Sequence, residues 1–178
     1  MVLSRVGLGA VAALVLAGTM YVGLSTYAAE PRNESLAARV QRLEDREEIR
    51  ALLLSYGRAV DRHDFNAFSA LFSEQGEWVN GATVLKGRKA IFEFMDKSMG
   101  HNSPNEPLTY HVMVNNNLIE VSGDRASAMT NSIVVRTVPD TGFPLFRFLG
   151  RYKDTFVREK GQWLFLRREA YTDVPAPK

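Results

Sequence analysis

His111, Asp61 and Tyr56 are the residues whose types and positions best suit proton chemistry. A histidine titrates near neutral pH, so it can take up and return a proton under working conditions. In an extended strand the side chains alternate between faces, which groups His111 with Met113 and Asn115. A histidine near an asparagine on a partly apolar face suits a pocket that needs a proton carrier. The alternative is a hydrogen-bonded histidine in the core.

Asp61 and Tyr56 lie five residues apart on one amphipathic stretch. Asp61 falls where this helix should end, and the helix macrodipole disfavours a carboxylate there. It is therefore either a surface acid paired with Arg58 or Arg62, or an acid that orients another group. Tyr56 lies on the apolar stripe, and a phenol in a dry pocket can donate to a carbonyl or a developing oxyanion. A core tyrosine with its hydroxyl at an edge is the alternative.

The elements that must position these groups follow from the periodicity of the chain. An apolar stripe at Ile49, Leu53, Tyr56 and Val60 predicts a helix. After a polar corner, the apolar residues of 65–72 predict a shorter helix, with Asp64 as its N-cap. Asn-Gly at 80–81 predicts a hairpin, and residues 87–99 return to the helical period. Long strands with short turns between them are predicted at 108–121, 125–138, 144–158 and 162–170. This order predicts an α+β fold with an antiparallel sheet wrapped around the N-terminal helices.

Tyr152 and Asp154 share a face of the strand predicted at 144–158, and Arg168 lies on the last predicted strand. A contact between Asp154 and Arg168 across the sheet is the favoured interpretation of these residues.

The N-terminal residues 1–28 have the pattern of a secretory signal peptide. Arg5 is the only charge before Glu30, an apolar run covers 6–24, and small residues at Thr26 and Ala28 suit cleavage after Ala28. An uncleaved membrane anchor is the alternative, since the run is about long enough to span a bilayer. Either places the folded part outside the cytoplasm, periplasmic or secreted, with membrane contact expected only if the segment stays uncleaved.

The remaining chain is predicted to hold one domain. Residues 29–43 are expected to be a linker and a solvated helical lead-in, or else an arm that packs on a neighbouring subunit. The domain itself is predicted at 44–172, followed by a tail at 173–178. An apolar outer face of the sheet, with residues such as Leu118, predicts a homodimer or a homotrimer.

Composition excludes several classes of protein. The chain has no cysteine, so disulfides and thiolate metal sites are excluded, and its three histidines lack the spacing of a zinc site. Basic and acidic residues are interspersed rather than clustered, so nucleic acid is not an expected partner. There is no glycine-rich phosphate loop and no nucleophile elbow. We therefore expect no metal and no cofactor.

Five segments together resemble a SnoaL-like domain of the nuclear transport factor two-like superfamily. They are SYGRAVDRHDFNAFSALF, LKGRKAIFEFM, HVMVNNNLIEVSGDRASA, GRYKDTFVR and GQWLFLRR, within about Glu44 to Arg168. The resemblance implies a conical α+β barrel, in which a strongly bent antiparallel sheet and helices close one deep apolar pocket. Relatives include scytalone dehydratase, bile acid dehydratase, ketosteroid isomerase and polyketide cyclases. Others only bind or assemble, so the fold does not decide the function.

The resemblance also implies roles for particular residues. The spacing from His111 to Asn115 is similar to that of the dehydratase segment that supplies the catalytic histidine. An acid at the position of Asp61 contacts or orients that histidine in the dehydratases, and the position of Tyr56 resembles that of a tyrosine that polarises the substrate. These three residues are the predicted catalytic set. Substrate contacts are predicted for Asn115, Trp78, Met113, Phe94 and Phe146.

The function implied is that of a cofactor-independent dehydratase (a lyase) or isomerase. It would act by acid/base chemistry on a small hydrophobic carbonyl or hydroxyl compound, steroid- or polyketide-like. The alternative is a non-catalytic module of the same fold that binds a small hydrophobic ligand.

Overall fold

The computed structural model describes residues 34–99, 109–138 and 140–174, with the backbone alone for 109–117. The chain divides into two units, Met1–Glu34 and Ser35–Lys178, and the helices and strands of the described residues all belong to the second unit. The signal peptide or anchor predicted at 1–28 and the tail beyond Val174 lie outside the described residues. Within the described ranges, no helix is both long and apolar enough to cross a membrane.

The first helix, α1 (Leu36–Asp61), joins the predicted lead-in and the predicted main helix into one element of 26 residues. It starts at Ser35, whose hydroxyl accepts a hydrogen bond from the backbone N–H of Ala38 at 3.2 Å. Its first turns are exposed, with Leu36 and Leu43 accessible to solvent. Its second half is the predicted apolar stripe, and Ile49, Leu53, Tyr56 and Val60 are all buried.

The polar corner after α1 turns the chain into a second short helix, α2 (Phe65–Ala70). His63 adopts a left-handed backbone conformation with φ of 54°, which ends α1 and turns the chain. The carboxylate of Asp64 then accepts a hydrogen bond from the backbone N–H of Ala67 at 2.9 Å. The prediction that Asp64 caps the second helix is therefore confirmed.

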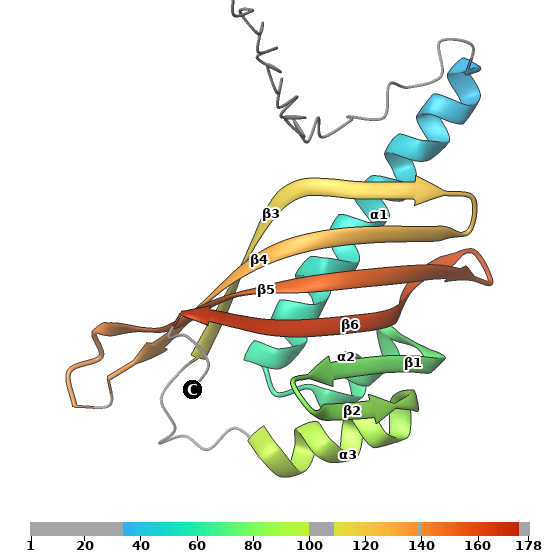
Figure 1. The fold of residues 1–178 in the computed structure, drawn as a ribbon. Coiled ribbons are helices and arrows are strands. Elements are labelled where there is room, and N and C mark those ends of the chain that lie inside the picture. The colour runs from blue at the N-terminus through green and yellow to red at the C-terminus, as the bar shows by residue number, and fades with distance from the viewer. Residues whose placement is uncertain (1–33, 100–108, 139, 175–178) are drawn as a thin grey trace, which may run out of the picture. The chain divides into compact units, whose positions relative to one another are not determined.

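Six strands of the described residues form one bent sheet. They are β1 (Phe72–Asn80), β2 (Thr83–Lys86), β3 (Thr109–Ser122), β4 (Arg125–Thr137), β5 (Pro144–Glu159) and β6 (Gln162–Val174). Their order in the sheet is β2-β1-β6-β5-β4-β3, and the sheet runs across one side of α1 (Figure 1). Helix α3 (Gly87–Met99) follows β2 and packs against β1 and α2. The predicted α+β class, with a sheet bent around N-terminal helices, is confirmed.

Two details of the sheet differ from the prediction. Strand β1 pairs with β6 in parallel, so the sheet is mixed, and β2 and β3 remain its two edges, so it is not closed into a barrel. The strand also begins at Phe72, which helical periodicity had assigned to the second helix. The cause is a long-range contact. The Leu71 carbonyl accepts a hydrogen bond from the Phe165 N–H at 2.9 Å, so the chain pairs with β6 directly after α2 and does not continue as a helix.

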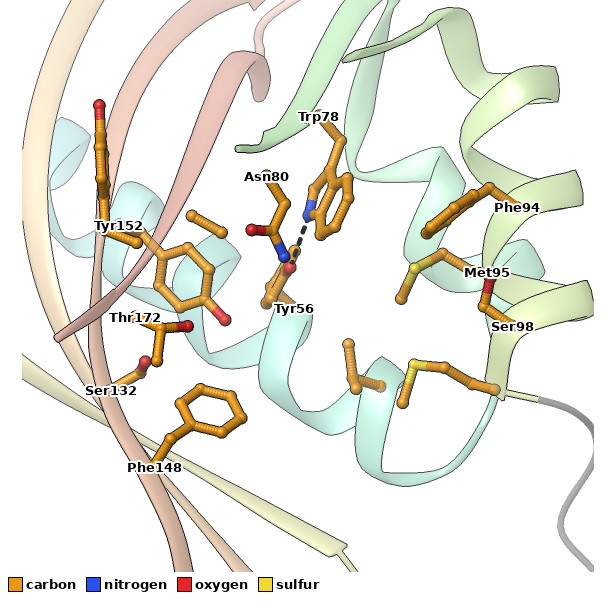
Figure 2. A pocket seen from close by; sticks show the side chains of 14 residues that line it. Tyr56, Trp78, Asn80, Phe94, Met95, Ser98, Ser132, Phe148, Tyr152 and Thr172 are labelled. Carbon is orange, nitrogen blue, oxygen red and sulfur yellow. Dashed lines mark hydrogen bonds between the residues drawn. The ribbon is translucent and has the colours of Figure 1, made fainter. Parts of the chain in front are cut away.

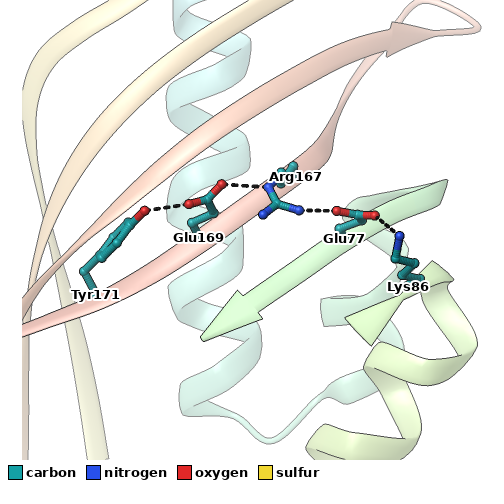
Figure 3. Close-up of polar contacts among 5 residues, drawn as sticks. All are labelled: Glu77, Lys86, Arg167, Glu169 and Tyr171. Carbon is teal, nitrogen blue, oxygen red and sulfur yellow. Dashed lines mark hydrogen bonds and ion pairs between the residues drawn. The ribbon is translucent and has the colours of Figure 1, made fainter. Parts of the chain in front are cut away.

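A row of charges on the solvent side joins the parallel strands to β2 (Figure 3). Lys86 contacts Glu77 at 2.9 Å, Glu77 pairs with Arg167, and Arg167 Nε lies 2.7 Å from Glu169. The Tyr171 hydroxyl donates to Glu169 at 2.5 Å. The Lys86 ammonium, followed by Arg167, holds the pKa of Glu77 below its usual value, and the Tyr171 hydroxyl is the main cause of the lowered pKa of Glu169. Among the described strands, this row crosses the parallel pairing of β1 with β6.

The core lies between α1, α2 and the inner face of the sheet. Its fully buried aromatic side chains come from α2 and from the strands that meet there, and their rings pack at centroid distances of 5.2–5.7 Å. They are Phe68, Phe72, Phe156 and Phe165. Tyr56 joins this cluster from α1, with its ring 4.7 Å from that of Phe68. The core therefore fixes one predicted site residue directly.

Candidate functional site

A cavity of about 180 Å³ opens at the end of this core, between α1, α3 and the inner face of the sheet (Figure 2). Residues from six elements line it, and most of the lining is apolar. They are Tyr56, Val60, Trp78, Asn80, Phe94, Met95, Ser98, Met99, Ser132, Phe148, Tyr152, Ala170, Tyr171 and Thr172. Its size is below the roughly 300–1,000 Å³ of sites for drug-sized ligands. The cavity suits a compound of one or two rings.

Helix α3 supplies the apolar wall through its periodicity. Phe94, Met95, Ser98 and Met99 recur at helical spacing, so one face of α3 meets the cavity. The Phe94 ring lies 5.8 Å from the indole of Trp78, which continues this wall onto β1. Methionine side chains adapt to irregular shapes, so this wall can accommodate ligands of somewhat different outline.

Tyr56 brings a polar group to the back of the cavity. The indole N–H of Trp78 donates a hydrogen bond to the Tyr56 hydroxyl oxygen at 3.1 Å, as Figure 2 shows. Because the oxygen accepts this bond, the phenol proton of Tyr56 is left to be donated elsewhere. Burial is the main cause that raises the pKa of Tyr56 far above its usual value, and Tyr152 adds to it, whereas Arg168 and the Trp78 hydrogen bond lower it. Tyr56 is therefore a neutral donor at every physiological pH.

The opposite wall carries three further hydroxyls, from β4, β5 and β6. Ser132 pairs with Gly150, and Gly150 pairs with Thr172, so the two hydroxyl residues flank a position with no side chain. A Cβ at Gly150 would lie 2.3 Å from the carbonyl oxygen of Tyr171, so only glycine fits there. Tyr152, two residues further along β5, turns its hydroxyl toward the same space (Figure 2).

A fully buried ion pair lies behind the tyrosines. Asp154 and Arg168 are opposite each other on β5 and β6, both with no exposed surface, and Arg168 Nε lies 3.6 Å from Asp154 Oδ1. The guanidinium carbon of Arg168 is 3.8 Å from the ring centroids of both Tyr56 and Tyr152. Burial raises the pKa of Asp154 to about 6, and the Arg168 charge acts against this rise.

Comparisons with known proteins agree with this architecture. The SnoaL-like domain family matches residues 41–169. The chain belongs to the SnoaL-like family. No curated protein sequence matches it.

Solved structures similar to this SnoaL-like protein include an NTF2-like protein with a cystatin-like fold from Novosphingobium aromaticivorans. It is 32% identical, with a TM-score of 0.68, over 82% of this chain and 94% of that one. A scytalone dehydratase-like protein from the same organism is 23% identical, with a TM-score of 0.64, over 76% and 89%. A hexachlorocyclohexane dehydrochlorinase (LinA) is 18% identical, with a TM-score of 0.63, over 76% and 89%. The last two likenesses show the fold alone.

Of the residues predicted to form the site, Tyr56, Trp78 and Phe94 line the cavity of the SnoaL-like protein. Phe146 does not belong to the described lining, and its side chain is 51% exposed. The register of β4 and β5 shifts at this point: Val134 pairs with Phe148, whereas Val135 pairs with Phe146. This β-bulge places the two phenylalanines on different faces, and Phe148 enters the cavity.

The backbone of β3 places His111 and Met113 in register with the cavity wall. His111 pairs with Val134, which is buried, and Met113 pairs with Ser132, which lines the cavity. The register shifts between Val114 and Leu118, so Asn115 falls in an irregular part of the strand. The side chains of His111, Met113 and Asn115 lie outside the described part, and their roles stay predictions.

Asp61 is the last residue of α1, directly after Val60 of the cavity lining, and it is partly buried. Its proposed contact with His111 stays a prediction. The pairing of Asp154 and Arg168 was the favoured interpretation of these residues, and the structure confirms the contact. Strand alternation also groups Tyr152 with Asp154 on one face, and that pattern was the signal for a polar cluster here. It gave no sign that Tyr152, Ser132 and Thr172 line a cavity.

No group of three histidine, aspartate or glutamate side chains that could hold a metal ion is found among the described residues. The polar groups of the described lining are hydroxyls, the Asn80 amide and the Trp78 indole N–H, which is bonded to Tyr56. Such groups can orient a carbonyl or hydroxyl compound and donate hydrogen bonds to it. The absence of a metal and of a cofactor stays a prediction.

Proposed function

We propose that the protein is a cofactor-independent dehydratase or isomerase that acts on a small hydrophobic carbonyl or hydroxyl compound. One observation carries the proposal: a buried phenol, Tyr56, accepts a hydrogen bond from Trp78 and keeps its own proton for the cavity. A preorganised donor in a dry cavity stabilises an oxygen on which negative charge develops. Enolisation next to a carbonyl, or elimination of water from the same kind of compound, needs such a donor and a base.

His111 is the proposed base. Its backbone position opposite Val134 places it in the strand next to the one that supplies Ser132. A histidine can remove a proton and return it to another atom of the substrate at neutral pH. Asp61 is proposed to orient the imidazole and to stabilise its charged form. Tyr56 would polarise the substrate oxygen.

Two solved proteins of this fold are described as a scytalone dehydratase-like protein and a dehydrochlorinase. Both names denote eliminations, in which a base removes a proton and a neighbouring group leaves. This supports the chemical class but no particular substrate. The cavity volume of about 180 Å³ is below the roughly 300–1,000 Å³ of sites for drug-sized ligands. It favours a substrate of one or two rings over a four-ring steroid.

The proposal includes export and self-association. The apolar run and small residues in 1–28 support secretion to the periplasm or beyond. The outer face exposes Leu118 and Met129, which pair with each other across β3 and β4, and an apolar surface of this kind supports a homodimer or homotrimer.

The test starts with a thermal-shift screen of one- and two-ring hydroxy and keto compounds, with steroids and terpenoids as larger comparisons. Ligands that raise the melting temperature are then assayed for turnover and for solvent deuterium exchange next to the carbonyl. His111→Ala should lower kcat by about 10²–10⁴, as expected for a lost general base. Tyr56→Phe should lower kcat, and it should also lower the free energy of unfolding by about 1–3 kcal/mol, because the buried Trp78 N–H loses its acceptor.

His63→Ala is the matched control, because it removes a histidine at the corner between α1 and α2. It should leave kcat unchanged. Full activity of the His111→Ala protein on a substrate of the parent would show that the base is another residue.

A second candidate is a binding module without turnover. It is favoured by the described lining, whose apolar, hydroxyl and amide groups are sufficient to hold a small ligand. Under this function the parent binds a compound without changing it, and the same variants alter only affinity.

A further inference from the structure

The guanidinium of Arg168 is enclosed by aromatic rings rather than by hydrogen-bond acceptors. Its central carbon lies 3.8 Å from the ring centroids of Tyr56 and Tyr152, and 4.8 Å from that of Phe165. Within the described part of the chain, none of its three nitrogens has a hydrogen-bond partner, and neither does either oxygen of Asp154. The nearest approach of the pair is 3.6 Å, from Nε to Oδ1.

This arrangement is costly if it serves packing alone. A buried ion pair offsets its desolvation only when good hydrogen bonds accompany it, and apolar residues of similar volume are often at least as stable. The pair adds no net charge to the interior, but its two ends differ in position. The positive end contacts the two tyrosines that line the cavity, and the carboxylate only pairs with it from β5.

A positive charge against the face of a phenol ring strengthens that phenol as a hydrogen-bond donor. Negative charge that shifts onto the phenol oxygen is then stabilised by the cation, and the low dielectric of the interior increases the effect. The Tyr56 hydroxyl also accepts the Trp78 N–H, which acts in the same direction. Tyr152 lines the same cavity with its ring 5.6 Å from that of Tyr56.

We propose that Arg168, held by Asp154, is a positioning residue that makes Tyr56 and Tyr152 a pair of strengthened donors for an anionic oxygen in the cavity. The inference rests on the proposed function for the role of Tyr56 and deepens it. It assigns a second donor, Tyr152, and the charged group that supports both. It also defines the ligand class as a compound whose oxygen carries full or developing negative charge, such as a phenolate or an enolate.

A binding experiment tests this without any turnover. The probe is 4-nitrophenol, a one-ring compound whose ionised form absorbs visible light. Bound to the parent protein, it should ionise at a lower pH than in free solution, because the donors favour the anion. A bound probe that stays neutral where the free probe is already ionised would overturn the proposal.

Variants then identify the contribution of Arg168. The double variant Asp154→Leu/Arg168→Met removes the pair without leaving one charge buried. At about pH 8, where a group with pKa near 6 is ionised, its affinity for ionised 4-nitrophenol should fall about ten- to thirty-fold. The affinity for neutral 2-naphthol should change less than about three-fold, since the aromatic contacts remain.

Arg167→Met is the matched control. It removes the same charge from the adjacent residue, whose side chain joins the outer row with Glu77 and Glu169 instead of the rings. Its affinities for both probes should equal those of the parent. Equal losses for the ionised and the neutral probe in the double variant would show that Arg168 only holds the rings in place, and would overturn the proposal.

The outcome is independent of whether the protein is an enzyme. Selective binding of the ionised probe with no turnover of any compound would support the role of Arg168 and count against the dehydratase or isomerase. Turnover without preference for the ionised probe would support the dehydratase or isomerase and would overturn the proposed role of Arg168.

Discussion

Asp45 and Asp154 are two buried acids that each face an arginine, and their surroundings are opposite. Asp45 on α1 pairs with Arg158, and it accepts further hydrogen bonds from Gln41 at 3.1 Å and from the Trp163 indole at 3.5 Å. Asp154 has only the Arg168 contact at 3.6 Å, with no hydrogen bond in the described part of the chain.

The two arginines differ in the same way. Arg158 keeps 21% of its side chain exposed, lies 4.7 Å above the Trp163 ring and is also 3.6 Å from Asp124. It can retain water and exchange partners. Arg168 has no exposed surface and no second acid among the described residues. The Asp45–Arg158 pair connects α1 to the end of the sheet, and its role is structural. The Asp154–Arg168 pair lies against two tyrosines of the cavity, so its charge can also act on their hydroxyls.

Breaking the second pair should give the largest loss of stability. Asp154→Ala leaves the Arg168 guanidinium buried without a countercharge, which should lower the free energy of unfolding by about 3–5 kcal/mol. Replacing both partners, as Asp154→Leu/Arg168→Met, should change it by less than about 1 kcal/mol or raise it. Urea unfolding monitored by tryptophan fluorescence measures both. A double variant as unstable as the single one would show that the Asp154–Arg168 pair itself stabilises the fold, and would contradict this prediction.

The pH dependence of stability should further distinguish the Asp154–Arg168 pair from the Asp45–Arg158 pair. The folded-state pKa of Asp154 is about 6, above its ordinary value of 3.8, so the folded protein binds a proton more tightly than the unfolded chain. The stability from this group is therefore fully present below the unfolded pKa, and it is lost as pH rises through about 6. At about 1.4 kcal/mol per pKa unit, the loss amounts to roughly 3 kcal/mol.

The double variant lacks this group, so the difference between parent and variant isolates Asp154. Unfolding free energies of both proteins, measured in urea from about pH 4 to about pH 7, should differ by a margin that shifts against the parent as pH rises. Glu77 and Glu169, whose pKa values are lowered, act in the opposite direction in both proteins and cancel in the difference. A constant difference over this range would mean that the Asp154 pKa is not raised.

The parts of the molecule that depend on neighbours in sequence could be predicted. The apolar stripe of α1 and the Asp64 cap follow from helical spacing and from a side chain three residues away. The burial of Tyr56 and the place of Trp78 in the cavity lining could also be predicted, because periodicity puts both side chains on the buried face of their element. Strand alternation likewise indicated that Tyr152 and Asp154 share a face.

The remaining features depend on contacts between distant segments. The parallel pairing of β1 with β6 joins Phe72 to Phe165, and no local pattern marks it. The β-bulge between Phe146 and Phe148 changes which ring enters the cavity, and it appears only once β4 and β5 are paired. The place of Arg168 between two rings needs α1 docked on β6. Periodicity shows which face of a helix or strand is buried. The geometry of a site also depends on the register between strands and on how the helices pack against the sheet.

Removing Asp45 should have a smaller effect than removing Asp154. Asp45→Ala deletes an acceptor shared by Arg158, Gln41 and Trp163, which should lower the free energy of unfolding by about 1–3 kcal/mol. The loss stays limited because Arg158 reaches solvent and can turn to Asp124, so no charge is left buried. Asp45→Asn, the matched control, keeps an oxygen acceptor and should lose about half as much. Urea unfolding gives both values, and 2-naphthol affinity should stay at the parent level, since Asp45 does not belong to the described cavity lining. A loss for Asp45→Ala as large as that for Asp154→Ala, or a change in 2-naphthol affinity, would show that the Asp45–Arg158 and Asp154–Arg168 pairs do not differ in role.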